Sequence, residues 1–250
     1  MKKTVKTIMI TLFMISLLAA CSNNTVDETL IIGYDNTFVP MGFLDEAGET
    51  VGFDIDLATE VFQRLEVDFL FQPIDWSMKE AELNNGNIDL LWNGYTLTEE
   101  RQKLVSYTDA YLENSQVMVT LHDSQIVTKA DLVDKTIATQ QGSSSLTAIE
   151  RDALLNEVSL NLYDTFDQAF RDLEIGRIDA LVVDEILAFY YINQRDANQY
   201  QILEEVLEEE IFVVAFRKDD TDLRDLVNEA LNELKADGTF DTYYEKWFSH

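Results

Sequence analysis

Three features of the sequence carry groups that could bind a small charged molecule. The guanidinium of Arg101 offers two parallel donors that match the two oxygens of a carboxylate. The run Gly142-Ser-Ser-Ser145 precedes a predicted helix, and the free amides at a helix start also attract a carboxylate. Asp184 directly follows an apolar segment, residues 178–183, and supplies an anion at the end of a predicted strand.

Each of these features also has an ordinary structural explanation. Arg101 follows Glu99 and Glu100, so it could lie on the exposed face of a helix. The serines of this run and Asp184 all stand at or just before the start of predicted helices, where serine and aspartate commonly cap the first turn. The residue types alone leave both explanations open.

The elements that would position these residues alternate between strands and helices. Apolar spacing predicts strands at residues 30–33, 67–71 and 88–92, with helices at 53–65 and 78–83 between them. The same order begins again after residue 115, with the following predicted strands and helices: strands 117–119, 136–139, 160–163 and 178–183; helices 145–155, 166–174 and 185–193. A strand at 211–216, a helix at 223–234 and a short aromatic helix end the chain.

This order predicts an α/β fold with two similar lobes, each built on a mixed, largely parallel sheet flanked by helices. Similar phrases near the end of each run, Asn87-Ile-Asp-Leu-Leu and Arg177-Ile-Asp-Ala-Leu, support the repeat. In such sheets ligands bind beyond the carboxyl ends of the strands. Asp184 stands at one of these ends.

The composition excludes several classes of protein. Hydrophobic residues make up 46% of the 250, which is enough for a substantial core. A formal charge of -29 repels nucleic acid, so no nucleic-acid partner is expected. Cys21 is the single cysteine, and the two histidines, His122 and His250, lie far apart. We therefore expect neither a disulfide nor a metal site, and the sequence contains no glycine-rich phosphate loop or other cofactor signature.

The N-terminus reads as an export signal with an anchor. Lysines at positions 2, 3 and 6 precede a short apolar stretch, residues 8–20, which is typical of a signal peptide. Leu18-Ala-Ala-Cys21 resembles the bacterial lipoprotein box, in which the cysteine is lipidated and becomes the new N-terminus. We expect a signal peptide at 1–20, a lipidated tether at 21–29 and a location on the extracytoplasmic face of the cell membrane. An ordinary signal peptide with an incidental cysteine is the alternative.

Six motifs occur in an order that resembles a known family. They are Asp35-Asn-Thr-Phe-Val-Pro40, Gly52-Phe-Asp-Ile-Asp-Leu57, Thr96-Leu-Thr-Glu-Glu-Arg101, Gly142-Ser-Ser-Ser145, Gly176-Arg-Ile-Asp-Ala180, and Asp237-Gly-Thr-Phe240 with Lys246-Trp-Phe248. Together they resemble the polar-amino-acid solute-binding proteins of ABC importers, which have the type II periplasmic-binding fold. The resemblance implies two lobes joined by a two-strand hinge that closes around the ligand. It divides the chain into one lobe at 30–112 plus 211–250 and a second at 113–210.

The resemblance also implies how a zwitterionic amino acid would be held. Arg101 would receive the α-carboxylate with help from Thr96, while Gly94 lets the backbone approach the ligand. Ser143 and Ser144 would add donors from the second lobe. The family places an acid at the position of Asp184 to accept from the α-ammonium.

The remaining site residues surround the ligand's side chain. The family sandwiches that side chain between aromatic rings that match Phe38 and Trp76, beside Asp35. Some glutamine-binding relatives carry a basic residue at the position of Gln140, which is neutral here. Asp35 would then be an uncompensated anion, which favours a cationic side chain or a good amide donor. We therefore favour histidine, arginine or lysine, followed by glutamine or cystine.

The resemblance implies a monomeric receptor rather than an enzyme. Its partners would be the free L-amino acid, the permease and ATPase subunits of an ABC importer, and the membrane through the lipid anchor. The alternatives are an enzyme on the same fold, similar to cyclohexadienyl dehydratase, and a ligand-sensing domain. An enzyme would need a general acid or nucleophile aimed at a reacting atom, whereas the acids named above are all used by the zwitterion.

Overall fold

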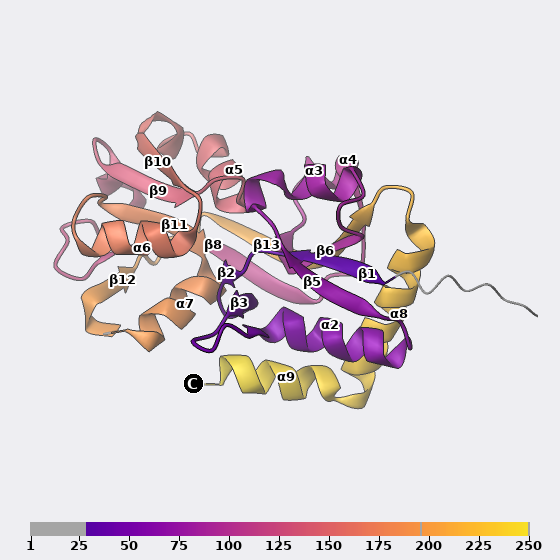
Figure 1. The fold of residues 1–250 in the computed structure, drawn as a ribbon. Coiled ribbons are helices and arrows are strands. Elements are labelled where there is room, and N and C mark those ends of the chain that lie inside the picture. The colour runs from indigo at the N-terminus through magenta and orange to yellow at the C-terminus, as the bar shows by residue number, and fades with distance from the viewer. Residues whose placement is uncertain (1–28, 196, 250) are drawn as a thin grey trace, which may run out of the picture.

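The computed structural model describes residues 29–195 and 197–249, so the predicted signal peptide and Cys21 lie outside the described residues. A central sheet runs through the molecule, with helices on both of its faces (Figure 1). Its strands follow the order β10-β9-β11-β8-β13-β6-β1-β5, with β12 added beside β8 and β7 beside β13. Among the described residues, no helix is both long and apolar enough to span a membrane.

The first half of the molecule comes mainly from the N-terminal part of the chain. Its strands are β1 (Leu30–Tyr34), β5 (Phe69–Pro73), β6 (Leu90–Thr96) and β7 (Val105–Tyr107), with a small second sheet formed by β2 (Thr37–Phe38), β3 (Gly42–Leu44) and β4 (Thr50–Val51). Its helices are α2 (Phe53–Arg64), η1 (Trp76–Met78), α3 (Lys79–Asn84), α4 (Arg101–Leu104), α8 (Thr221–Asp237) and α9 (Thr239–Phe248). The C-terminal helices α8 and α9 pack beside α2 and so return the chain to this half (Figure 1).

The second half repeats the alternation. Its strands are β9 (Thr136–Gln140), β10 (Ser159–Tyr163), β11 (Ala180–Asp184) and β12 (Tyr200–Ile202). Its helices are η2 (Lys129–Leu132), α5 (Ser144–Arg151), η3 (Leu155–Glu157), α6 (Phe166–Glu174), α7 (Glu185–Gln194) and η4 (Ala197–Gln199). Within each half the neighbouring strands β5-β1-β6 and β10-β9-β11 are parallel, as predicted.

Two long strands connect the halves. β8 (Leu112–Leu121) and β13 (Glu208–Arg217) pair antiparallel with each other in the middle of the sheet (Figure 1). β8 also pairs with β11 of the second half, and β13 with β6 of the first. Both strands are longer than the sequence pattern predicted, because their polar ends pair with each other. The predicted lobe bounds fall within these two strands, and the bounds themselves stay a prediction.

Most predicted elements occur within a few residues of their expected positions, and α6 has the predicted bounds. The predicted helix 145–155 is wrong at its C-terminal end: α5 ends at Arg151, because Asp152 takes an extended conformation, with φ -74° and ψ 126°. The predicted strand 67–71 begins two residues late, after Glu66 adopts a positive φ of 54°. These differences do not affect the start of α5 or the end of β11, which carry candidate residues.

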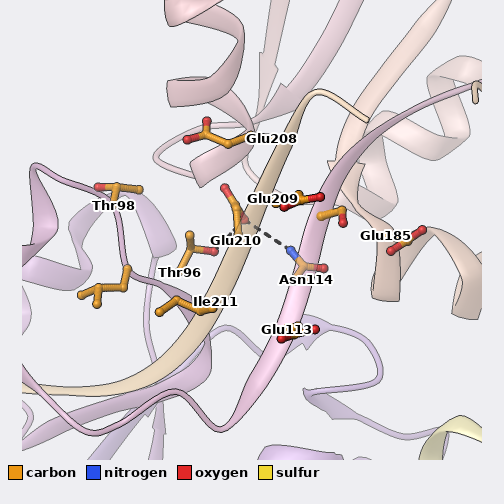
Figure 2. Close-up of a pocket in the computed structure, with 11 residues that line it drawn as sticks. Thr96, Thr98, Glu113, Asn114, Glu185, Glu208, Glu209, Glu210 and Ile211 are labelled. Carbon is orange, nitrogen blue, oxygen red and sulfur yellow. Dashed lines mark hydrogen bonds between the residues drawn. The ribbon is translucent and has the colours of Figure 1, made fainter. Parts of the chain in front are cut away.

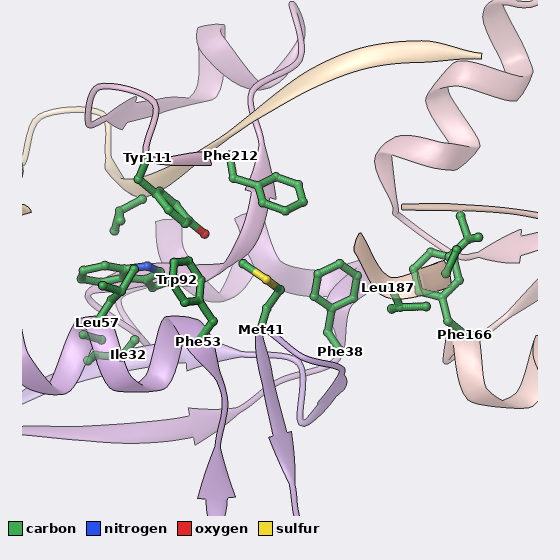
Figure 3. Close-up of a cluster of buried hydrophobic side chains, with 14 of the residues drawn as sticks. Ile32, Phe38, Met41, Phe53, Leu57, Trp92, Tyr111, Phe166, Leu187 and Phe212 are labelled. Carbon is green, nitrogen blue, oxygen red and sulfur yellow. The ribbon is translucent and has the colours of Figure 1, made fainter. Parts of the chain in front are cut away.

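The core is rich in aromatic side chains. Phe53, Trp92 and Phe212 are fully buried in its main cluster, and burying each such side chain contributes about 2 kcal/mol or more. Figure 3 shows this cluster running from Trp92 through Phe38 toward Phe166. The rings of Phe38 and Phe166 belong to opposite halves, and their centroids lie 6.1 Å apart. Apolar contact therefore continues across the boundary between the halves.

Candidate functional site

Arg101 is buried at the boundary between the halves. It begins α4, just after β6, and only 7% of its surface is exposed, which rules out the surface explanation. Its Nη1 donates to the carbonyl of Thr96 at 2.9 Å and its Nη2 to the carbonyl of Gly142 at 3.0 Å. The guanidinium also lies over the ring of Tyr95, with 4.7 Å to the centroid. Arg101 is thus a fixed, buried cation that touches both halves.

The serines at the start of α5 have two different roles. Ser143 caps the helix, since its hydroxyl accepts from the amide of Leu146 at 3.2 Å. Ser144 instead extends across the boundary, where its Oγ lies 3.1 Å from Oγ1 of Thr96. The capping explanation therefore holds for Ser143 and not for Ser144.

Asp184 is the last residue of β11 and makes no side-chain cap to α7. Its Oδ1 accepts from Nδ2 of Asn114 at 2.7 Å and from Nε2 of Gln116 at 2.9 Å. Burial, together with the nearby carboxylate of Glu210, raises the pKa of Asp184 to about 7. The parallel strand delivers a buried acid to the cleft, as the sequence predicted.

Asp35 and Gln140 form another hydrogen bond between the two halves. Gln140 donates from Nε2 to Oδ2 of Asp35 at 2.7 Å and to the carbonyl of Asp164 at 2.9 Å. Thr37 satisfies Oδ1 of Asp35 with its amide and hydroxyl. Burial raises the pKa of Asp35, and its hydrogen-bond donors named here are neutral.

The aromatic candidates lie close by. Trp76 packs against Tyr95 with centroids 6.3 Å apart, and Nζ of Lys79 lies 5.2 Å from the Trp76 ring. Gly94 has a φ of +55°, and a Cβ there would come within 2.6 Å of the Phe38 ring. The amide of Gly94 donates to Oδ2 of Asp54 at 2.7 Å. Glycine at this position thus makes room for Phe38.

Eight of the ten candidate residues line one small cavity at the boundary. Its lining consists of Phe38, Trp76, Gly94, Arg101, Gln140, Ser143, Ser144 and Asp184, together with Phe166. The other two candidates are hydrogen-bonded to residues of this lining: Thr96 to Ser144, and Asp35 to Gln140. The cavity measures about 10 Å³, which is roughly room for one water molecule and too small for an amino acid in this arrangement.

Several residues in this region were not singled out from the sequence. Glu210 on β13 accepts from Thr96 and from Asn114 of β8 (Figure 2). Ser144 and Gln116 also donate to its carboxylate. Asn114 and Gln116 show the period of two that places side chains on one face of a strand, which is the signal that could have identified them. Glu210 belongs to an acidic run, residues 208–210, that reads as solvated surface.

Lys79 was also missed. It is 2% exposed, and its Nζ donates to the carbonyls of Trp76 at 3.2 Å and Gly142 at 2.8 Å. Burial lowers the pKa of Lys79 to about 7. Among the described residues, no group of three or more His, Cys, Asp or Glu side chains could hold a metal ion.

The arrangement joins a buried cation and a buried anion across a cleft between two lobes, which suits a zwitterion. Comparison with known proteins agrees with this geometry. Residues 30–250 match the family model of bacterial extracellular solute-binding proteins, family 3. A histidine-binding periplasmic protein of Escherichia coli is 30% identical over 99% of this chain and 97% of its own. An L-cystine-binding protein of the same species is 29% identical over 90% of this chain and 85% of its own.

A solved structure is also similar. The substrate-binding protein of an ABC uptake transporter from Streptococcus pneumoniae, with bound histidine, is 44% identical and has a TM-score of 0.86. The match covers 89% of this chain and 93% of that one. It confirms the two-lobed type II periplasmic-binding fold, with β8 and β13 as the connecting strands. The chain belongs to the bacterial extracellular solute-binding proteins, family 3.

Proposed function

We propose that this protein is an extracytoplasmic receptor that captures a cationic amino acid for an ABC importer by closing its two lobes around it. The observation that carries the proposal is the buried pair of Arg101 and Asp184 facing one cleft from opposite halves. Arg101 would receive the α-carboxylate and Asp184 the α-ammonium. Because each lobe supplies one of these groups, binding would stabilise the closed form.

The charge of the pocket supports a cationic side chain. Asp35 is 6% exposed and is hydrogen-bonded by Gln140 and Thr37, which are neutral. With Arg101 and Asp184 matched to the zwitterion, and Lys79 paired with Glu80 at 3.2 Å, Asp35 is an additional anion. It bonds Gln140, which lines the same cavity as the rings of Phe38 and Trp76. A buried carboxylate is costly without a countercharge, so a cationic side chain between these rings would be stabilised. Histidine, arginine and lysine are therefore favoured over glutamine and cystine.

The relatives described above are named for binding histidine and cystine, and the histidine-bound structure has the higher sequence identity, 44%. All three are binding proteins, which supports a receptor rather than an enzyme. We further propose that the receptor acts as a monomer, that Cys21 carries its lipid anchor, and that its lobes comprise residues 30–112 plus 211–250 and residues 113–210.

Titration calorimetry of the purified protein against the twenty amino acids and L-cystine tests the ligand class. We expect the tightest binding from histidine, arginine or lysine, weaker binding from glutamine, and none from glutamate. Tight binding of glutamate or leucine with no binding of the cationic set would contradict the charge argument.

Substitution of Arg101 tests the proposed carboxylate site. Arg101→Ala should abolish detectable binding, and Arg101→Lys should weaken it at least about 10-fold, because an ammonium cannot offer two parallel donors. Arg177→Ala is the matched control, since Arg177 is exposed and pairs with Asp172 within the second half, so its loss should leave the affinity within about twofold. Calorimetry measures both, and circular dichroism checks that the variants fold. Tight binding by folded Arg101→Ala would refute the assigned role.

A further inference from the structure

Glu210 contacts both halves of the molecule and the connecting strand β8. It lies on β13 where that strand crosses between the halves, and its Oε2 accepts four hydrogen bonds. The donors are Oγ1 of Thr96 at 2.9 Å, Nε2 of Gln116 at 2.9 Å, Oγ of Ser144 at 3.1 Å and Nδ2 of Asn114 at 3.3 Å. Figure 2 shows Glu210 between Thr96 and Asn114. Thr96 belongs to the first half, Ser144 to the second, and the amides to β8.

Glu210 and Asp184 share the same two donors. Nε2 of Gln116 lies 2.9 Å from each carboxylate, and Nδ2 of Asn114 lies 2.7 Å from Asp184 and 3.3 Å from Glu210. Two acids bridged by common neutral amides repel each other when both are ionised, and retaining one proton relieves that repulsion. Such a proton would belong to the pair rather than to either residue.

Burial and the repulsion between the two acids favour such a proton. Burial raises the pKa of Glu210, although the hydrogen bonds from Gln116, Thr96 and Ser144 and the positive charge of Arg101 oppose this shift. Burial and the charge of Glu210 raise the pKa of Asp184 to about 7. Other acids line an open cavity of about 550 Å³ with Glu210: Glu113, Glu185, Glu208 and Glu209. Alternation along the strands directs Glu113 and Glu209 away from the side that carries Asn114 and Glu210, and Glu208 lies 3.5 Å from the cation Arg151. The raised pKa of Asp184 therefore comes from burial and from the charge of Glu210.

Glu210 also determines how Thr96 faces the ligand. A threonine hydroxyl has one proton to donate and two lone pairs. Oγ1 of Thr96 donates that proton to Glu210 and accepts from Oγ of Ser144, so one lone pair remains to accept from a ligand N–H. With Glu210 ionised, the hydroxyl of Thr96 would therefore serve the α-ammonium, in place of the role toward the α-carboxylate that the family resemblance implies.

We propose that Glu210 is a positioning residue whose carboxyl group shares a proton with Asp184, and that this proton leaves when the ligand's α-ammonium binds. The O–H bond of the shared carboxyl breaks, the proton passes to water or buffer, and the ammonium donates to the carboxylate that is freed. The inference rests on the proposed function, because it concerns the α-ammonium position of the same cleft. It makes amino-acid binding depend on pH.

The direction of this dependence follows from linkage. Below about pH 7 the pair must give up its proton before the ammonium binds, so affinity falls by up to about 10-fold per pH unit. Above about pH 7 the pair is ionised and affinity becomes level. Calorimetry of wild type with L-arginine, L-histidine and L-glutamine between about pH 5.5 and 7.5 measures the profile. Repeating it in two buffers of different ionisation enthalpy gives the protons released, which we expect to approach about one per ligand near pH 6.

Glu210→Gln isolates the contribution of the pair. The amide keeps the size and an acceptor but carries no charge, so Asp184 ionises at lower pH. We expect this variant to bind at about pH 7.5 and to lose most of the fall in affinity toward pH 5.5. The ligand's own titration affects wild type and variant equally. It therefore cancels when the change in affinity with pH is compared between the two proteins. Glu209→Gln is the matched control, since Glu209 is the exposed neighbour on the same strand; its profile should follow that of wild type.

The outcomes separate the two proposals. Binding with a flat pH profile and no proton release in wild type overturns this inference and leaves the receptor function intact. An unchanged profile in folded Glu210→Gln also overturns it. Failure of every amino acid to bind at any pH overturns the receptor function, and this inference with it.

Discussion

Asp54 is a second buried acid near the cleft, with a different role from that of Asp184. It is fully buried in α2, and its Oδ2 accepts from the amide of Gly94 at 2.7 Å and the hydroxyl of Tyr111 at 2.8 Å. These bonds fix the end of β6, where Gly94 lines the cavity. Burial nevertheless raises the pKa of Asp54 from 3.8 to about 7.

The raised pKa of Asp54 makes stability depend on pH. Between about pH 4 and pH 7 the folded state holds a proton on this carboxyl that the unfolded chain has released, so the free energy of unfolding falls as pH rises. Asp54→Asn should remove this contribution and reduce the loss of stability between about pH 5 and 7.5 by roughly 1 to 3 kcal/mol. Urea denaturation of the ligand-free protein at both pH values measures it.

Glu46→Gln is the control for this experiment, because Glu46 lies exposed in the loop between β3 and β4 and should leave the pH dependence of stability unchanged. If the free energy of unfolding of Asp54→Asn fell with pH as steeply as that of wild type, Asp54 of the folded wild-type protein would be ionised throughout this range. The proton would then have to be assigned to another group.

At the scale of elements, the turn between β9 and α5 carries the contact between the lobes. Gly142 has a φ of +73°, and a Cβ there would lie 2.9 Å from Cα of Ser77 in the other half. Its carbonyl accepts from Lys79 at 2.8 Å and from Arg101 at 3.0 Å. Both cations come from the first half, so this turn is where closure brings the backbones together.

Gly142→Ala should therefore weaken ligand binding. A methyl group would press against backbone, which cannot move aside as a flexible side chain can, and we expect the affinity to fall at least about 10-fold. Gly176→Ala is the matched control: its φ is +70°, and a Cβ there meets nothing within 4 Å. Both variants should lose about 1 to 2 kcal/mol of stability from the left-handed conformation. Equal affinities for the two variants would contradict a role for Gly142 in closure.

How much the sequence predicts also depends on the element. Helices with one apolar face, such as Phe166–Glu174, were predicted well, because apolar spacing follows their burial. The ends of the connecting strands were not. Residues 208–210 are glutamates, and they are strand because pairing with β8 satisfies their backbone groups. Such pairing depends on residues far away in the chain.

The same limit applies to the candidate site. The order of motifs predicted Arg101 and Asp184, and the structure brings them to one cavity. Glu210 could not be predicted, because its partners Thr96 and Gln116 lie 114 and 94 residues away. In the sequence, Glu210 looks the same as its neighbours Glu208 and Glu209. Only the hydrogen-bond donors that the fold brings to it set it apart.

At the scale of the whole molecule, the strongest feature is the negative charge. The chain has 47 acidic residues against 18 lysines and arginines, and the formal net charge is -29. Five glutamates, including Glu210, line the open cavity beside the connecting strands. A surface of uniform negative charge attracts cations from solution. The electrostatic field of these acids would therefore raise the local concentration of cationic ligands near the cleft.

The association rate constant of a cationic amino acid should therefore depend on salt. Stopped-flow fluorescence can follow binding through the tryptophans, because Trp76 lines the cleft. Between about 20 and 500 mM NaCl, we expect the rate constant for arginine to fall roughly 3- to 10-fold, because salt screens the field. Glutamine has no net charge, and its rate constant should change by less than about twofold in the same protein. If arginine and glutamine respond equally to salt, the acidity of the surface has no part in ligand capture and serves other properties, such as solubility.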